Sequence, residues 1–96
     1  MKRVTLSDLN ELCEELNKMT SCPLETCTRD KDGNFTHNVG NYHLNMAYGG
    51  HKIVRNVNTS GGIREITHGF LSKRECLDKG HEYARLINAN PEYAKI

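Results

Sequence analysis

The chain of 96 residues contains no tryptophan, only four tyrosines and two phenylalanines, and no excess of charge of either sign. Thirteen Lys and Arg residues oppose twelve Asp and Glu residues, which leaves a formal net charge of +1. A chain with this balance has no global positive field to attract a phosphate backbone, which disfavours nonspecific nucleic-acid binding. Such a short chain buries a modest core and has little stability to spare, so a bound partner or a homodimer is compatible with its composition.

Long apolar runs are also absent. No window approaches the roughly eighteen apolar residues of a membrane-spanning helix. The amino terminus, MKRVTLSDLNELCEELNKM, has basic residues without the apolar region of a secretion signal. These absences predict a cytoplasmic protein with no membrane partner. Its four cysteines are then expected to be free thiols, with Cys13 and Cys76 as small core residues.

Signatures of catalysis and metal binding are missing as well. The chain contains neither GxGxxG nor GxxxxGKS or GxxxxGKT, and no local pattern places a base beside a thiol. The best zinc ligands are Cys22, Cys27, His37 and His43, but structural zinc sites use two closely spaced pairs of ligands, and here the histidines are dispersed. We therefore predict a protein that is not an enzyme and has no cofactor and no metal site.

Two amphipathic helices are predicted near the ends of the chain. Over Leu6–Met19 the apolar residues recur every three or four positions, and Thr5 is a suitable N-cap. Ser72 can begin a second helix through a capping box, and Asn90-Pro91 ends it. Both helices are expected to bury their apolar faces against the same layer.

The most apolar and glycine-punctuated stretch, Asn41–Gly62, lies between these helices. Strands are predicted at about 41–47, 51–57 and 63–67, and a weaker hairpin at 24–29 and 35–37. The predicted fold is α+β: an antiparallel meander of three to five strands, with the N-terminal and C-terminal helices on one face and the other face open to solvent or a partner. It forms a single domain over residues 1–90, followed by a short tail over residues 91–96 in which Glu92–Ile96 is expected to be frayed.

The two glycine pairs admit a structural and a functional interpretation. Gly49-Gly50 and Gly61-Gly62 are most simply hairpin turns, but glycines also let a ligand approach the backbone amides. Basic and aromatic residues around the meander, with a helix start at Ser72–Arg74, favour an anion or nucleotide pocket in the second interpretation. The basic residues alternate with Glu65 and Glu75, which favours an ordinary mixed-charge surface.

The pattern HLxxAYGGxxxxRxxNxxGG, which stands here as His43–Gly62, resembles one in a group of small uncharacterised proteins encoded by tailed bacteriophages. The resemblance extends from about Leu6 to Ile87. It implies a viral protein that acts in the host cytoplasm, and it brings no established activity with it.

Two main hypotheses about function follow from the residues and this resemblance. The first is a non-enzymatic phage accessory protein that binds a host protein, in host takeover or counter-defence. The alternative is a small-molecule binder that sequesters an anionic ligand or nucleotide signal, and nucleic-acid binding is a second, disfavoured alternative. The predicted binding residues are those of the central pattern: His43, Tyr48, Gly49, Gly50, Arg55, Asn58, Gly61 and Gly62.

Overall fold

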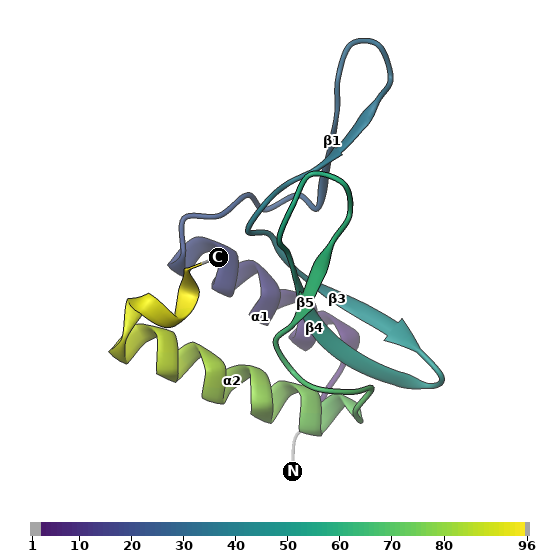
Figure 1. The fold of residues 1–96 in the computed structure, drawn as a ribbon. Helices are drawn as coiled ribbons and strands as arrows, with labels where there is room; N and C mark the ends of the chain where they lie inside the picture. The colour runs from purple at the N-terminus through teal and green to yellow at the C-terminus, as the bar shows by residue number, and fades with distance from the viewer. Residues whose placement is uncertain (1–2, 96) are drawn as a thin grey trace.

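The structure is a computed structural model that describes residues 3–95. A helix at each end of the chain flanks the strands, and a 3-10 helix follows the second of them (Figure 1). The elements in chain order are α1 (Leu6–Met19), β1 (Cys27–Arg29), β2 (Phe35–His37), β3 (Tyr42–Ala47), β4 (Gly50–Asn56), β5 (Ile63–Glu65), α2 (Lys73–Ala89) and η1 (Pro91–Ala94).

Both helices begin at the predicted caps. The Thr5 hydroxyl accepts a hydrogen bond from the Asp8 amide, and the Asp8 carboxylate accepts one from the Thr5 amide. Ser72 caps α2 by accepting from the Glu75 amide. These bonds satisfy amides that the first turn of a helix leaves without intrahelical partners. Over residues 3–95, no helix is long and apolar enough to cross a membrane.

The strands form two sheets rather than one. β3, β4 and β5 make an antiparallel meander in that order. β1 and β2 pair with each other in a separate sheet and project from the body as a hairpin, which we call the arm (Figure 1). The α+β class and the antiparallel meander between two helices are therefore confirmed, and the predicted strand count fits in part.

The core lies between the helices and one face of the meander. Its buried side chains come from α1, β3, β4 and α2: Leu9, Leu12, Cys13, Leu16, Tyr42, Ile53, Cys76 and Ile87. Gly80 lets α2 approach closely, since a Cβ there would lie 2.5 Å from Leu12 Cδ2 and 2.8 Å from Ile53 Cδ1. This packing explains a glycine within a helix, where it is otherwise unfavourable by about 1 kcal/mol. Burial raises the pKa of the Cys13 thiol to about 12, as expected of a core cysteine.

A buried asparagine attaches α1 to the edge of the meander. Asn17 is 1% exposed, and its amide nitrogen donates to the Tyr42 carbonyl at 3.0 Å while its amide oxygen accepts from the Tyr42 N–H at 2.6 Å. The side chain therefore replaces a neighbouring strand at this position of β3. Both backbone groups are paired without contact with water.

The second face of the meander is only partly open. Val54 and Asn56 are buried on this face, although it was expected to be free for solvent or a partner. Asn56 Nδ2 donates to the carbonyls of Thr26 and Asn38, which flank the strands of the arm. The base of the arm therefore covers this end of the sheet, and the expectation of an open face is wrong there.

The chain after α2 remains ordered as the 3-10 helix η1. η1 is capped by Asn90, whose side chain accepts from the Glu92 amide, and Ala94 packs against the core. The Ala94 carbonyl accepts a hydrogen bond from Arg55 Nη1 of β4. The predicted fraying is therefore wrong for residues 92–94, because a contact distant in sequence holds this segment in place, and Ile96 lies outside the described residues.

Candidate functional site

The predicted binding residues do not converge on one pocket. Tyr48, Gly49 and Gly50 lie at the turn between β3 and β4, and Asn58, Gly61 and Gly62 lie in the loop between β4 and β5. His43 and Arg55 occupy opposite faces of the meander, because Arg55 pairs with Tyr42 and His43 with Val54. The predicted residues therefore occupy four separate places in the fold: the hairpin tip, the β4–β5 loop, and the two faces of the meander.

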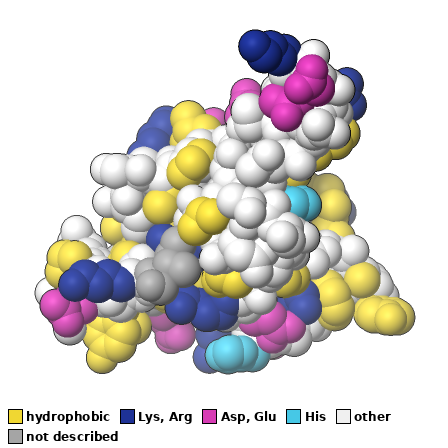
Figure 2. Space-filling view, turned by 45° about the horizontal axis from the view of Figure 1, so that its top comes forward, with side chains coloured by type: hydrophobic (Ala, Val, Ile, Leu, Met, Phe, Trp, Pro, Cys, Tyr) yellow, Lys and Arg dark blue, Asp and Glu magenta, His cyan; other side chains and the backbone are white. Residues whose placement is uncertain are grey.

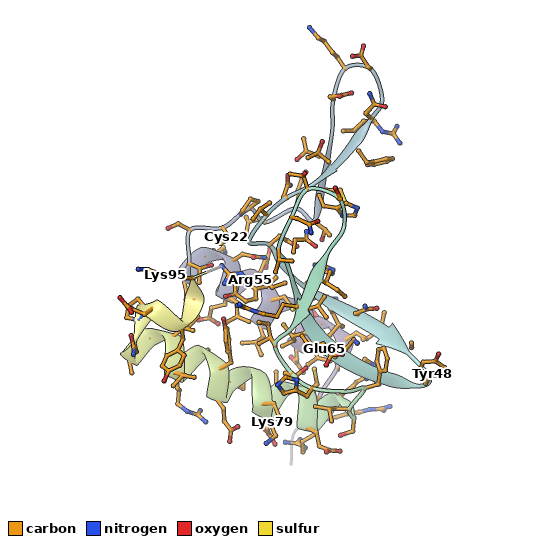
Figure 3. All side chains as sticks on the ribbon, viewed as in Figure 1. Cys22, Tyr48, Arg55, Glu65, Lys79 and Lys95 are labelled. Carbon is orange, nitrogen blue, oxygen red and sulfur yellow. The ribbon has the colours of Figure 1, made fainter. Side chains whose placement is uncertain are left out.

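The tip of the β3–β4 hairpin is a two-residue turn formed by Tyr48 and Gly49. Both have positive φ, 54° and 74°, and Ala47 pairs directly with Gly50 across the strands. Positive φ at both central residues is the geometry of a type I′ hairpin turn. Tyr48 is 96% exposed and lies at the outer end of the hairpin (Figure 3). A predicted reversal is confirmed here, with Gly50 belonging to β4 instead of the turn.

Gly50 makes room for an aromatic side chain. A Cβ at this position would lie 2.6 Å from Phe70 Cβ. The Phe70 ring lies 5.7 Å from the Tyr48 ring in an edge-on arrangement, and Lys52 Nζ sits 4.4 Å from its centroid. Lys52 also forms an ion pair with Glu65. We call Tyr48, Lys52 and Phe70 the tip patch.

Arg55 is a buried structural residue. It is 2% exposed, and its guanidinium carbon lies 4.5 Å above the Tyr42 ring. Nε donates to the Gly40 carbonyl at 3.1 Å, Nη1 to Ala94 and Nη2 to Cys22 Sγ at 3.4 Å. Figure 3 shows it between Cys22 and the carboxy-terminal segment that carries Lys95. Its donors are directed at groups of the chain itself and do not face an external anion.

The β4–β5 loop is organised by Asn58. Its side-chain oxygen accepts from the amides of Ser60 and Gly62 at 3.0 and 2.9 Å, which is a local turn made by an Asn side chain. A Cβ on Gly62 would meet the Asn58 amide at 2.3 Å. Gly61 has φ of 98°, and a Cβ there would lie 3.1 Å from His37 Nε2. This loop therefore has a structural role and packs against the arm.

His43 lies on the second face of the meander, half-buried. Its Nδ1 is 3.1 Å from the Asn41 side-chain oxygen. Burial lowers the pKa of His43, and the neighbouring His37 lowers it further. A neutral imidazole is therefore favoured at this position, which makes it a poor anion ligand.

One juxtaposition was missed by the sequence analysis. Cys27 and His37 are directly paired across the arm, and Cys27 Sγ lies 3.3 Å from His37 Nδ1. A thiol is therefore beside a base. The two residues are ten positions apart, so they form no local sequence motif. The predicted hairpin was the sequence feature that could have indicated their pairing. Cys22 lies elsewhere, against Arg55. Within residues 3–95, no group of three or more His, Cys, Asp or Glu side chains is arranged to hold a metal ion.

A shallow basic recess lies where the hairpin meets the start of α2. Its volume is about 470 Å³, and its lining residues are Arg3, Val4, Gly49, His51, Ser72, Lys73 and Arg74. Elsewhere the charges alternate: on the face shown in Figure 2, basic and acidic side chains are interspersed instead of forming a patch of one sign. This distribution matches the near-neutral composition.

Comparisons of this chain with models of known protein families, with curated proteins and with solved structures found no match.

Proposed function

We propose that this chain is a non-enzymatic binding protein that contacts another protein through the tip patch. The observation that carries this proposal is Tyr48, a residue that is 96% exposed at a position with φ of 54°. Glycine, Asn or Asp usually occupies such a turn position, because an L-residue with a larger side chain is strained there. The tyrosine therefore stabilises neither the turn nor the core.

An exposed tyrosine of this kind is suited to recognition. Tyrosine provides a large amphipathic contact area with few rotatable bonds, and tyrosines are enriched among residues that dominate binding energy. The edge-on contact with Phe70 and the position of Lys52 over Phe70 support one side of the patch. A partner with an apolar cleft and a polar rim would bury the Tyr48 ring and leave Lys52 at the edge of the interface.

The proposed setting comes from the resemblance of His43–Gly62 to small tailed-phage proteins. On that basis the partner is a host protein, the location is the host cytoplasm, and the role is host takeover or counter-defence. The sequence signatures support a binding role over catalysis, because neither a nucleotide-binding loop nor a known nucleophile motif is present.

The test compares the wild type with Tyr48→Asn and Tyr48→Phe. Asn suits the left-handed turn, so Tyr48→Asn should be as stable as the wild type in thermal unfolding. Affinity capture from bacterial lysate with each variant as bait, followed by titration of the purified partner, should show binding by the wild type and Tyr48→Phe. Tyr48→Asn should bind at least about tenfold more weakly, since loss of a hot-spot side chain costs about 2 kcal/mol or more.

Two results would count against this proposal. Equal binding by all three proteins would exclude the tip patch as the interface. Capture of no stoichiometric partner at several salt concentrations would remove the protein-binding function. Analytical ultracentrifugation of the wild-type protein measures whether it self-associates. Self-association would mean that the partner is a second copy of this chain.

The small-anion alternative is favoured by a different observation, the basic recess. Lys73 and Arg74 there join Arg3 and His51 beside the start of α2, and cationic side chains near a helix N-terminus favour phosphate groups. Thermal-shift measurements with inorganic phosphate and with linear and cyclic nucleotides test this alternative. Stabilisation that is lost in Lys73→Gln would support it, and a flat response across the set would remove it.

A further inference from the structure

We propose that Cys27 and His37 form a thiol–imidazole pair that undergoes thiol–disulfide exchange with low-molecular-weight disulfides, which makes the arm a site of reversible modification. This site is separate from the tip patch. The experimental test of this site therefore has an outcome that does not depend on whether the proposed binding function is correct.

The geometry of the pair is that of a nucleophile beside a base. Cys27 Sγ is 3.3 Å from His37 Nδ1, which is close enough for a hydrogen bond between the thiol and the ring nitrogen. Direct cross-strand pairing of the two residues in the arm keeps the side chains on the same face. Both residues are half-buried, so neither belongs to the closed core, and the proposal requires that a small disulfide reach the thiol.

The body of the protein positions the base. The His37 amide donates to the Thr59 carbonyl at 3.2 Å, and the His37 ring lies so close to Gly61 that a Cβ there would be 3.1 Å from Nε2. The β4–β5 loop therefore holds His37 from one side while Cys27 contacts it from the other. A glycine at position 61 provides the space that this ring occupies.

The chemical step is balanced without a further reagent. The Cys27 thiol gives its proton to His37 Nδ1, and the resulting thiolate attacks one sulfur of the disulfide RSSR. A bond forms between Cys27 Sγ and that sulfur, the original S–S bond breaks, and the leaving thiolate RS⁻ takes the proton from the imidazolium. A second thiol reverses the modification by the same chemistry.

Two other charged or titratable side chains lie near the pair. Arg29 lies two residues along β1 and stacks over Phe35, 4.4 Å from the ring. His43 approaches from β3, and the neighbouring His37 helps to lower its pKa, after burial. The β4–β5 loop, residues 57–62, contains no ionisable side chain. His37 is therefore the base in contact with the thiol.

The experiment measures the modification rate of each cysteine by peptide mass spectrometry, using iodoacetamide and glutathione disulfide as probes. Cys27 should react faster in the folded protein than in urea-unfolded protein, and His37→Gln should slow it by about tenfold or more. Cys22, which is also half-buried but contacts Arg55, should keep its rate in His37→Gln. The buried Cys13 and Cys76 should remain unmodified, which shows that the variant is folded.

The outcomes are distinct. Slower reaction of Cys27 in the folded than in the unfolded wild type would overturn the proposal, and this comparison needs no variant. An unchanged Cys27 rate in a folded His37→Gln protein would overturn it equally, because the pair would then be a structural contact only. Formation of the Cys27 mixed disulfide in the wild type, with its loss in His37→Gln, would support it.

Discussion

The neighbouring Gly49 and Gly50 are expected to resist substitution for different physical reasons. Gly49 has φ of 74°, and nothing lies within 4 Å of the position that a Cβ would take. Placing an L-residue in the left-handed region costs about 1–2 kcal/mol. Reduced entropy of the unfolded chain offsets about 0.4–1 kcal/mol of this. We expect Gly49→Ala to lower the free energy of unfolding by about 1 kcal/mol.

Substitution of Gly50 instead creates a steric conflict. A Cβ there would lie 2.6 Å from Phe70 Cβ and 2.9 Å from the Phe70 backbone carbonyl carbon. Because one of these is a backbone atom, the segment around Phe70 must move, and overpacking of this kind costs about 1–3 kcal/mol. Gly50→Ala should therefore lower the free energy of unfolding by about 2 kcal/mol, and the branched Gly50→Val by more.

Asparagine variants separate the two mechanisms. Asn tolerates positive φ, so Gly49→Asn should recover most of the stability lost in Gly49→Ala, whereas Gly50→Asn should be at least as destabilising as Gly50→Ala. Urea and thermal unfolding followed by circular dichroism measure this, and a loss of about 2 kcal/mol corresponds to a fall in Tm of roughly 8–16 °C. Equal losses in Gly49→Asn and Gly49→Ala would refute the left-handed turn. Wild-type stability of Gly50→Ala would refute the contact with Phe70.

Two further predictions concern the buried Asn17 and the half-buried His43. Asn17→Leu leaves the Tyr42 N–H and carbonyl unpaired, at about 1–3 kcal/mol for each; urea unfolding should show a loss several times that of the exposed control Asn10→Leu, and similar losses would contradict this. Burial and then His37 lower the pKa of His43, so the folded state binds this proton less readily than the unfolded chain. The free energy of unfolding should therefore fall as pH drops below about 6.5, and a His43→Asn variant should show a weaker fall; an unchanged profile would refute this contribution.

The helices and the turn geometry were predictable because their causes are local. Thr5 and Ser72 cap helices through bonds to residues three positions away, and apolar periodicity marks the buried faces over short windows. Gly49 likewise signals a reversal, since positive φ is a property of a single residue. For these features, the residue types and their spacing contain most of the physical information.

The roles of the pattern's polar residues were decided by tertiary structure. Arg55 was predicted to bind an anion, but the Gly40 carbonyl, the Ala94 carbonyl and Cys22 Sγ surround it in the fold. Gly50 belongs to a strand, and its need for a small side chain comes from Phe70, twenty residues further along the chain. Neither contact has a signature in the residues immediately around it.

The candidate sites also combine features that the sequence predicts with features that only the tertiary structure determines. The sequence pattern placed Tyr48 among the predicted binding residues, but its exposure, its positive φ and its contact with Phe70 required the packed fold. Cys27 and His37 become neighbours only when the arm pairs and the β4–β5 loop packs against His37. Hydrogen-bond geometry between side chains distant in sequence depends on strand register and on contacts between separate segments, and local propensities do not specify either one.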